Sequence, residues 1–235
     1  MFKAVIKEYL WDFVGLFYPR LCLACGLNLP PGDSRICIRC EFHSVKTGFH
    51  LAQYNEFTDR LVGRIPLYTA ASLYFFIKDT PVQRLLHQLK YNDKPDIGVD
   101  IGKIYGAILT ESPLYHDIDV IVPVPLHPKK QHKRGYNQSE RFAAGLAEAM
   151  KKPCVADGLK KIELNESQTR KNRMERAENA LDMYEVNQFE ALKNKHILLV
   201  DDVMTTGATL EACALPLLAL PNIKISIVTI AIAKR

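Results

Sequence analysis

Apolar residues recur at helical spacing near the beginning and in the middle of the chain. Between positions 82 and 89 they fall at i, i+3, i+4 and i+7, which predicts an amphipathic helix that ends near Lys90. Thr80 offers a side-chain cap for this helix, and Pro81 suits its first position. Residues 1–21 show similar spacing. They predict a second amphipathic helix, which we expect to pack against the body of the protein or a partner subunit rather than a membrane surface.

Predicted strands and helices alternate from about residue 60 to the end of the chain. Residues 67–77 have the aromatic and β-branched character of a strand pair or hairpin. Further helices are predicted at 97–109, 139–150 and 209–220, and further strands at 120–124, 197–200 and 224–233. This alternation predicts an α/β domain over residues 60–235, with a mostly parallel sheet and helices on both faces.

The composition is that of a soluble globular protein, because 48% of the 235 residues are hydrophobic and 24% are charged. A formal net charge of +5 favours anionic ligands without requiring them. The longest uninterrupted apolar run near the N-terminus, residues 14–18, is too short for a signal peptide core or a spanning helix. We therefore expect a cytoplasmic protein without a membrane span.

Four of the six cysteines form two CxxC pairs with eleven residues between them. These are Cys22, Cys25, Cys37 and Cys40. Such pairs are typical of zinc ribbons or knuckles, in which four thiolates close a structural site, so residues 22–50 are predicted to form a small zinc module. The alternatives are a redox dithiol pair or incidental cysteines, and His43 or His50 could replace a ligand. Cys154 and Cys213 stand in apolar surroundings and are expected to be small core residues.

The apolar strand 197–200 runs directly into a polar turn that precedes a helix. This string comprises Asp201, Asp202, Val203, Met204, Thr205, Thr206, Gly207, Ala208 and Thr209. Two adjacent carboxylates at the carboxyl end of a strand can accept hydrogen bonds from a vicinal diol and reach magnesium through water. The free N–H groups of the next helix can cradle a phosphate, with Gly207 allowing a tight turn. A strand that ends in Asp before a capped helix is common in α/β proteins, but the full string is more specific and indicates a sugar-phosphate site.

Two basic segments could face an anionic ligand. The first contains Lys129, Lys130, Lys133, Arg134, Gly135, Tyr136 and Asn137. Its cations can bind phosphates, and Asn137 or Ser139 can cap the following helix; the alternative is a basic surface loop after a strand. The second, residues 168–179, includes Arg173 and reads as a mobile loop or hood. It could instead be a solvated helix face on which Glu175 and Glu178 pair with the arginines.

These motifs together resemble known families. The string from Ile197 to Thr209 resembles the signature of type I phosphoribosyltransferases that binds phosphoribosyl pyrophosphate (PRPP): four hydrophobic residues, two acids and a turn rich in threonine and glycine. The stretch VPVPLHPKKQHKRGYNQSE, the later SQTRKNRMERAEN, the LKY around Lys90 and the leading cysteine module resemble the ComF family of competence-associated proteins, which includes GntX-like members. This resemblance runs from Cys22 to the last predicted strand.

The resemblance implies a type I phosphoribosyltransferase fold with residues 122–137 as its pyrophosphate loop. It further implies PRPP with magnesium as the ligand, a nitrogen acceptor that no motif names, and catalytic roles for Asp201, Asp202 and Arg173. Residues 168–179 resemble the loop that closes over the reacting centre, although ENALDMYEV departs from the usual pattern after the arginines. Because ComF relatives are linked to DNA uptake and transformation, contact with single-stranded DNA or the uptake machinery is implied. The alternative is a PRPP sensor or single-stranded-DNA-handling protein without catalysis, and a homo-oligomer is compatible with either.

Overall fold

The computed structural model describes residues 19–30, 35–162 and 183–234. Nearly all of the helix predicted over residues 1–21, and the whole basic segment 168–179 with Arg173, lie outside these residues. Both therefore remain predictions from the sequence. Among the helices of the described residues, none combines the length and the apolar character needed to cross a bilayer.

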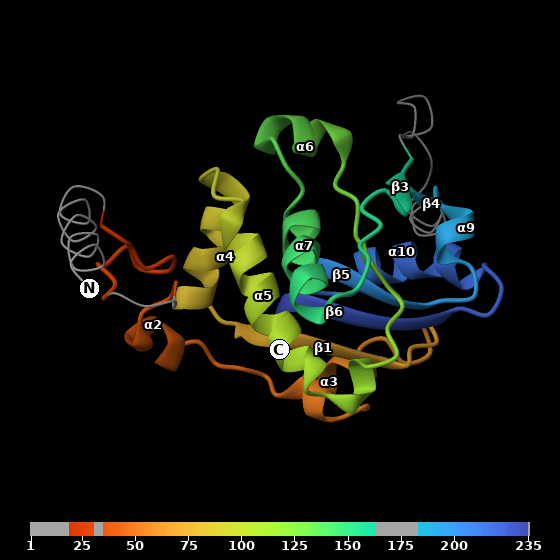
Figure 1. The fold of residues 1–235 in the computed structure, drawn as a ribbon, viewed down its shortest axis with the longest axis horizontal. Helices are drawn as coiled ribbons and strands as arrows, with labels where there is room; N and C mark the ends of the chain where they lie inside the picture. Colours follow the sequence, from red (N-terminus) through yellow and green to blue (C-terminus); the bar gives the residue numbers. More distant parts are fainter. Residues whose placement is uncertain (1–18, 31–34, 163–182, 235) are drawn as a thin grey trace, which may run out of the picture.

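A parallel sheet forms the centre of the described structure (Figure 1). Its strands lie in the order β1 (Thr69–Phe76), β6 (Lys224–Ala233), β5 (His196–Met204) and β2 (Val120–Pro123). Each neighbouring pair is parallel. The carboxyl ends of these strands consequently meet at one edge, where open α/β sheets bind ligands. The predicted parallel sheet is confirmed.

Helices cover both faces of this sheet, as the alternation of strands and helices predicted. One face is covered by α4 (Pro81–Tyr91), α5 (Asp96–Thr110) and α7 (Gln138–Met150). The other is covered by α3 (Glu56–Asp59), α9 (Phe189–Leu192) and α10 (Ala208–Leu218). Along β5, Leu198 and Val200 are buried in the first core, whereas Ile197 and Leu199 are buried in the second. The period of two along a strand thus divides one apolar run between two cores.

Helices α5 and α7 approach each other closely through a pair of glycines. A Cβ atom on Gly102 would lie 2.3 Å from the carbonyl oxygen of Phe142, and one on Gly145 would lie 2.1 Å from that of Val99. No larger residue fits this contact without moving a backbone. The contact fixes α7, whose first turn faces the carboxyl edge of the sheet.

Several predicted elements differ from the structure in extent or type. The segment 67–77 contains one strand, β1 (Thr69–Phe76), rather than a hairpin, because this strand pairs along its length with β6. Strand β5 continues to Met204, beyond the predicted end at Val200, because its polar end still pairs with β6. Between the cysteine segment and β1, the chain forms the short 3-10 helix Phe49–Leu51 and α3, for which no element was predicted from the sequence. Thr80 does not cap α4; its hydroxyl donates to the carbonyl of Ile77 instead.

The predicted pyrophosphate loop contains a short helix, α6 (Pro128–Arg134). Pro128 occupies its first turn, and the His127 side chain accepts a hydrogen bond from the N–H of Lys129 at 3.2 Å. A separate antiparallel pair, β3 (Leu159–Lys161) and β4 (Tyr184–Val186), flanks residues 163–182. Lys161 of β3 and Tyr184 of β4 line the cleft described below, so this pair of strands lies beside the carboxyl edge of the main sheet.

Candidate ligand-binding cleft and metal centre

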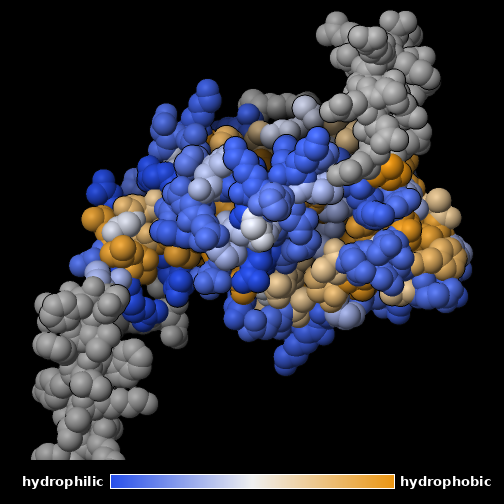
Figure 2. Space-filling view, turned by 90° about the horizontal axis from the view of Figure 1, so that it is seen from above, coloured by the Kyte–Doolittle hydropathy of each residue, from blue (hydrophilic) through white to orange (hydrophobic). Residues whose placement is uncertain are grey.

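A cleft of about 590 Å³ lies at the carboxyl edge of the sheet, and we call it the main cleft. Phe76, Val124 and Ala233 line it, at or directly beyond the ends of β1, β2 and β6, and Asp201 lines it from the last part of β5. Asp201 and Asp202, which we call the acidic pair, therefore share one cavity with the basic helix α6. The two motifs were recognised separately in the sequence, each as a candidate to bind an anionic sugar phosphate. Figure 2 views the molecule from the α6 side and shows hydrophilic side chains over most of the middle of this face.

Asp201 is held in place by two hydrogen bonds. Its Oδ1 accepts from the Ser139 hydroxyl and from the backbone N–H of Asp202, both at 2.8 Å. Burial and the neighbouring Asp202 carboxylate raise the pKa of Asp201 to about 7. A cation or a set of hydroxyl donors at this position would favour the ionised form. The carboxyl group is therefore prepared for a positively charged or hydrogen-bond-donating ligand.

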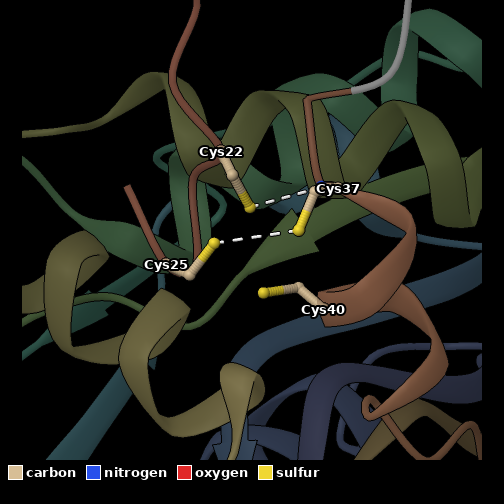
Figure 3. A group of neighbouring side chains, drawn as sticks. All are labelled: Cys22, Cys25, Cys37 and Cys40. Carbon is tan, nitrogen blue, oxygen red and sulfur yellow. Dashed lines mark hydrogen bonds between the residues drawn. The ribbon is translucent and has the colours of Figure 1, made fainter. Parts of the chain in front are cut away.

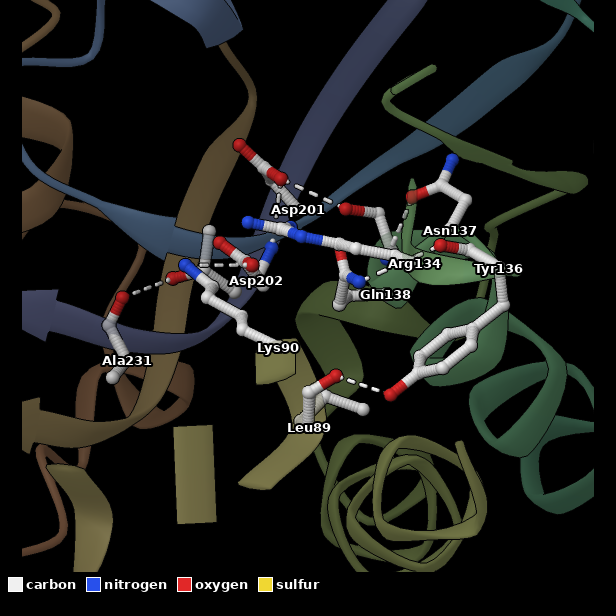
Figure 4. Close-up of polar contacts among 11 residues, drawn as sticks. Leu89, Lys90, Arg134, Tyr136, Asn137, Gln138, Asp201, Asp202 and Ala231 are labelled. Carbon is white, nitrogen blue, oxygen red and sulfur yellow. Dashed lines mark hydrogen bonds and ion pairs between the residues drawn. The ribbon is translucent and has the colours of Figure 1, made fainter. Parts of the chain in front are cut away.

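Asp202 forms an ion pair that the sequence motifs did not reveal. The Lys90 ammonium lies 2.8 Å from Asp202 Oδ2, with side-chain exposures of 25% and 14% for the lysine and the aspartate. Figure 4 shows the end of the Lys90 side chain next to Asp202, while Arg134 extends in the direction of the two aspartates. Lys90 comes from the last turn of α4, far from either motif in sequence. Only the quoted LKY match pointed to this position.

The turn between β5 and α10 forms a small separate hollow. Its volume is about 20 Å³, and residues 203–210 line it together with Asp201. Gly207 caps α10 with a φ of 81°, in the left-handed region that favours glycine. Arg64 fixes the turn from outside, because its Nη1 donates to the Thr206 carbonyl at 2.7 Å and its Nε to Glu211 at 3.0 Å. The predicted phosphate cradle is thus braced by a residue that sequence reasoning missed.

Gly207→Ala is expected to distort this turn and lower protein stability. A left-handed φ costs a non-glycine residue about 1–2 kcal/mol, and the added Cβ would also lie 2.8 Å from Leu61 Cδ2. Gly63→Ala is the matched control, because Gly63 has a φ of 75° and open space around it. Urea unfolding should show a larger loss for Gly207→Ala than for Gly63→Ala. Equal losses would mean that the contact with Leu61 adds nothing to the cost of the left-handed φ.

Of the seven residues predicted on the first basic segment, three line the main cleft: Lys130, Arg134 and Asn137. Lys133, Gly135 and Tyr136 line an adjoining hollow of about 620 Å³, which we call the side hollow. Lys129 is exposed and lines neither of these two cavities. The basic segment therefore contributes side chains to the walls of two neighbouring cavities.

Arg134 and Asn137 are fixed by specific contacts. Arg134 Nη1 donates to Gln138 Oε1 at 2.7 Å, and its guanidinium lies 5.2 Å from the centre of the Tyr91 ring. The Asn137 side chain accepts from the Ser139 N–H at 3.0 Å and so caps α7, while the Ser139 hydroxyl is left for Asp201. The cap predicted for this helix is thus confirmed for Asn137. Because Asn137 caps the helix, the first turn of α7 positions the Ser139 hydroxyl next to Asp201.

Two further residues of the main cleft, Lys161 and Tyr184, come from β3 and β4. Lys161 Nζ donates to the Tyr184 hydroxyl at 3.2 Å, and burial lowers the lysine pKa, with Lys130 adding to the effect. Sequence reasoning did not find either residue. The available signal was their position in the chain, within seven residues of the predicted hood.

The four predicted metal ligands come together. The sulfur atoms of Cys22, Cys25, Cys37 and Cys40 all lie within 4.8 Å of one another, and those of Cys25 and Cys37 are 3.7 Å apart (Figure 3). A tetrahedral zinc site with bonds of about 2.3 Å separates its sulfur atoms by roughly 3.8 Å. The Cys37 N–H also donates to Cys22 Sγ at 3.3 Å. The geometry therefore fits a metal such as zinc.

The two histidines considered as replacement ligands are not part of this group, as far as the described residues extend. His43 Nδ1 lies 2.7 Å from the carbonyl of Arg39, and the His50 ring packs edge-on against Tyr105. Of the two isolated cysteines, Cys213 is fully buried, as predicted, and Cys154 is partly buried.

The cysteine segment is attached to the body of the protein through α4. Gln88 Nε2 donates to the carbonyl of Leu23 at 2.7 Å, and Arg84 Nε donates to that of Ala24 at 3.1 Å. Cys22 and Cys40 are buried in the same core as the apolar face of α4. One side of α4 therefore contacts the cysteine segment, and Lys90 at its end reaches the main cleft.

Comparison with known proteins agrees with this geometry. Residues 137–235 match the family model of the phosphoribosyl transferase domain. The fold and the site thus define a protein of the phosphoribosyltransferase-fold class.

The chain is 33% identical over 215 residues to Competence protein ComFC of Bacillus subtilis, which covers 88% of this chain and 82% of that protein. It is 23% identical over 209 residues to Competence protein F of Haemophilus influenzae, covering 83% and 89%. The DNA utilization protein YhgH of Salmonella typhi is 26% identical over 140 residues, which are 57% of this chain and 60% of that protein. The chain belongs to the ComF family of competence-associated proteins.

Proposed function

We propose that this protein binds PRPP and transfers its phosphoribosyl group to a nitrogen acceptor, with release of pyrophosphate. The observation that carries the proposal is the arrangement of the main cleft, in which Asp201, Asp202 and the threonines of the following turn lie at the end of β5 and share the cavity with the basic helix α6. PRPP has a diol between two phosphate-bearing ends. Asp201 and Asp202 would accept hydrogen bonds from the ribose diol, and the turn at 205–209 would hold the 5-phosphate.

The pyrophosphate end would then lie on the side of Lys130 and Arg134. In the reaction, the nitrogen forms a bond to carbon 1 of the ribose while the bond from that carbon to the pyrophosphate oxygen breaks. The pyrophosphate leaves with the electron pair, and cations fixed beforehand near its oxygens stabilise the developing charge. Magnesium, when bound, would neutralise part of this charge. Arg173 and the rest of residues 168–179 are proposed to close over the cleft.

We assign the cysteine cluster to structural zinc, because four thiolates leave no open position on a tetrahedral metal. The proposed organisation is an N-terminal helix at 1–21, a zinc module at 22–50 and the phosphoribosyltransferase domain at 60–235. We place the protein in the cytoplasm, where a reducing environment keeps such thiols available for the metal.

The direct test is release of pyrophosphate from PRPP with a panel of nitrogen acceptors, such as ammonia, amino compounds and nucleobases. Release that depends on an acceptor and is lost in the Asp201→Asn/Asp202→Asn variant would support transfer. Saturable PRPP binding without release across the panel would instead favour a sensor.

Arg134→Ala is expected to weaken binding of PRPP more than binding of ribose 5-phosphate, because the proposed binding mode puts the pyrophosphate on the side of Arg134. The expected loss for PRPP is roughly tenfold to a hundredfold, the range of one charge-assisted hydrogen bond. Lys133→Ala is the matched control, since it removes one charge from α6 but lines only the side hollow. Calorimetry with the two ligands separates the effects. Equal losses for both ligands would mean that Arg134 acts through the fold.

A second candidate function is handling of single-stranded DNA, and the side hollow favours it. Lys130, Lys133 and Arg134 line this hollow together with Tyr91, which is 64% exposed. Cations that follow a backbone and an exposed aromatic ring that stacks on bases are the two elements of single-strand binding. Affinity for an unstructured oligonucleotide should fall steeply with salt and also fall on Tyr91→Ala. Binding that is insensitive to this substitution would remove the side hollow from consideration.

A further inference from the structure

Lys90 stands out because its closest partner is a residue that the proposed ligand needs. We propose that Lys90 forms an ion pair with Asp202 in the ligand-free cleft. When a ribose or a hydrated cation binds Asp202, the Lys90 side chain turns and its ammonium pairs with a phosphate oxygen of the ligand instead. This inference rests on the proposed function and adds a residue from α4 to the ligand-binding set. It makes Lys90 a residue that selects the metal–phosphate complex over the metal alone.

The electrostatics of the main cleft support an exchange of partners. Asp202 lies beside a second carboxyl group, and the ammonium of Lys90 compensates its charge at 2.8 Å. A divalent cation that arrives without an anion must displace Lys90 from Asp202 and leave the ammonium unpaired. A cation that arrives with phosphate groups brings a new acceptor for it. Lys90 therefore weakens binding of the free divalent cation and favours binding of the cation that carries phosphate groups.

The position of Lys90 allows this exchange through its side chain alone. Lys90 lines both the main cleft and the side hollow, and so do Lys130 and Arg134. The phosphate oxygens of a ligand near α6 would therefore be within the same cavity as the ammonium. The side chain is 25% exposed, which leaves it room to turn.

The helix that carries Lys90 is fixed at several points. The Tyr136 hydroxyl donates to the carbonyl of Leu89 at 2.5 Å, next to Lys90 (Figure 4). Gln88 and Arg84, two and six residues before Lys90, bind the cysteine segment. Both ends of this half of α4 are thus anchored. The ammonium can therefore change partner by rotation of the Lys90 side chain while the backbone of α4 stays in place.

The test compares two probes in Lys90→Met. Affinity for Mn²⁺ alone, read from the electron paramagnetic resonance of free Mn²⁺, is expected to increase at least about threefold, because Asp202 loses its competing cation. Affinity for PRPP with Mg²⁺, measured by calorimetry, is expected to decrease roughly tenfold or more. Lys90→Arg should stay near the parent protein in both. Lys94→Met removes a nearby exposed charge that does not line the main cleft and should leave both unchanged.

The opposite signs separate the inference from simpler explanations. A Lys90 that only stabilises α4 would lower both affinities on substitution, and that result would overturn the inference, as would no change in either. Asp202→Asn serves as the blank for Mn²⁺ bound elsewhere. If the parent protein binds no PRPP, the proposed function fails. If the parent binds PRPP and Lys90→Met binds it equally well, only the role of Lys90 fails.

Discussion

Replacing Asp201 and Asp202 together by asparagine is expected to weaken PRPP binding by about two to four decades. Each amide keeps the size of the carboxylate but removes the anionic acceptor that a ribose diol and hydrated magnesium require. A hydrogen bond to a charged group contributes roughly 1.5–3 kcal/mol, so the loss of two explains this range. Asp93→Asn is the matched control, because Asp93 is an exposed carboxylate of the side hollow and does not line the main cleft.

The same double variant should keep or raise its melting temperature without ligand. The carboxyl of Asp201 has a pKa near 7 because of burial and the adjacent Asp202, so above that pH the fold contains a carboxylate that it disfavours. A raised carboxyl pKa means that the folded protein loses stability as pH rises from the ordinary value toward 7. The gain from asparagine is thus expected at pH 8 and should shrink at pH 5. If PRPP with Mg²⁺ stabilises the double variant as much as the parent protein, the assignment of this strand end and turn as the PRPP-binding site is wrong.

Removal of the metal is the second change with a large expected effect. The purified protein should carry about one zinc per chain, and Cys37→Ser should release it. Metal binding in such sites contributes directly to folding free energy, so the cysteine segment should lose its structure. Cys154→Ser is the control, since Cys154 is a thiol outside the cluster. Metal analysis reads the outcome, and a zinc content near zero in protein purified without chelator would contradict the assignment.

The structure extends the expected consequence of metal loss beyond residues 22–50. The sequence predicted a small zinc module over residues 22–50, and a separate module would loosen alone when its metal is lost. The carbonyls of Leu23 and Ala24, however, accept hydrogen bonds from Gln88 and Arg84 on α4. Amide exchange in α4 should therefore increase in Cys37→Ser. Exchange restricted to the cysteine segment would mean that α4 is held by the apolar core alone.

The sequence predicted the fold well where the pattern of apolar residues was regular. Strand β6 and helices α4, α5 and α7 were placed within one or two residues, because each has a continuous apolar face bounded by polar or turn residues. The end of β5 could not be predicted from hydrophobicity, since Asp201 and Asp202 continue the strand through backbone pairing with β6. Helix α6 was missed because its seven residues, PKKQHKR, carry no apolar stripe.

The candidate site was predictable where it is local in sequence. The four cysteines and the turn at 205–209 are motifs in which neighbouring residues act together, and the structure brings them together. The contacts of Lys90 with Asp202, Ser139 with Asp201 and Arg64 with Thr206 join distant segments. Such pairs depend on how helices pack on the sheet, which spacing along one chain does not specify.

The proposal that the main cleft binds PRPP is tested by calorimetric titration of the zinc-loaded protein with PRPP in the presence and absence of Mg²⁺. We expect saturable binding at one site per chain that depends on Mg²⁺, with a Kd between about 1 µM and 1 mM, and competition by excess pyrophosphate. The absence of binding heat and of any thermal stabilisation at millimolar PRPP with Mg²⁺ would contradict it.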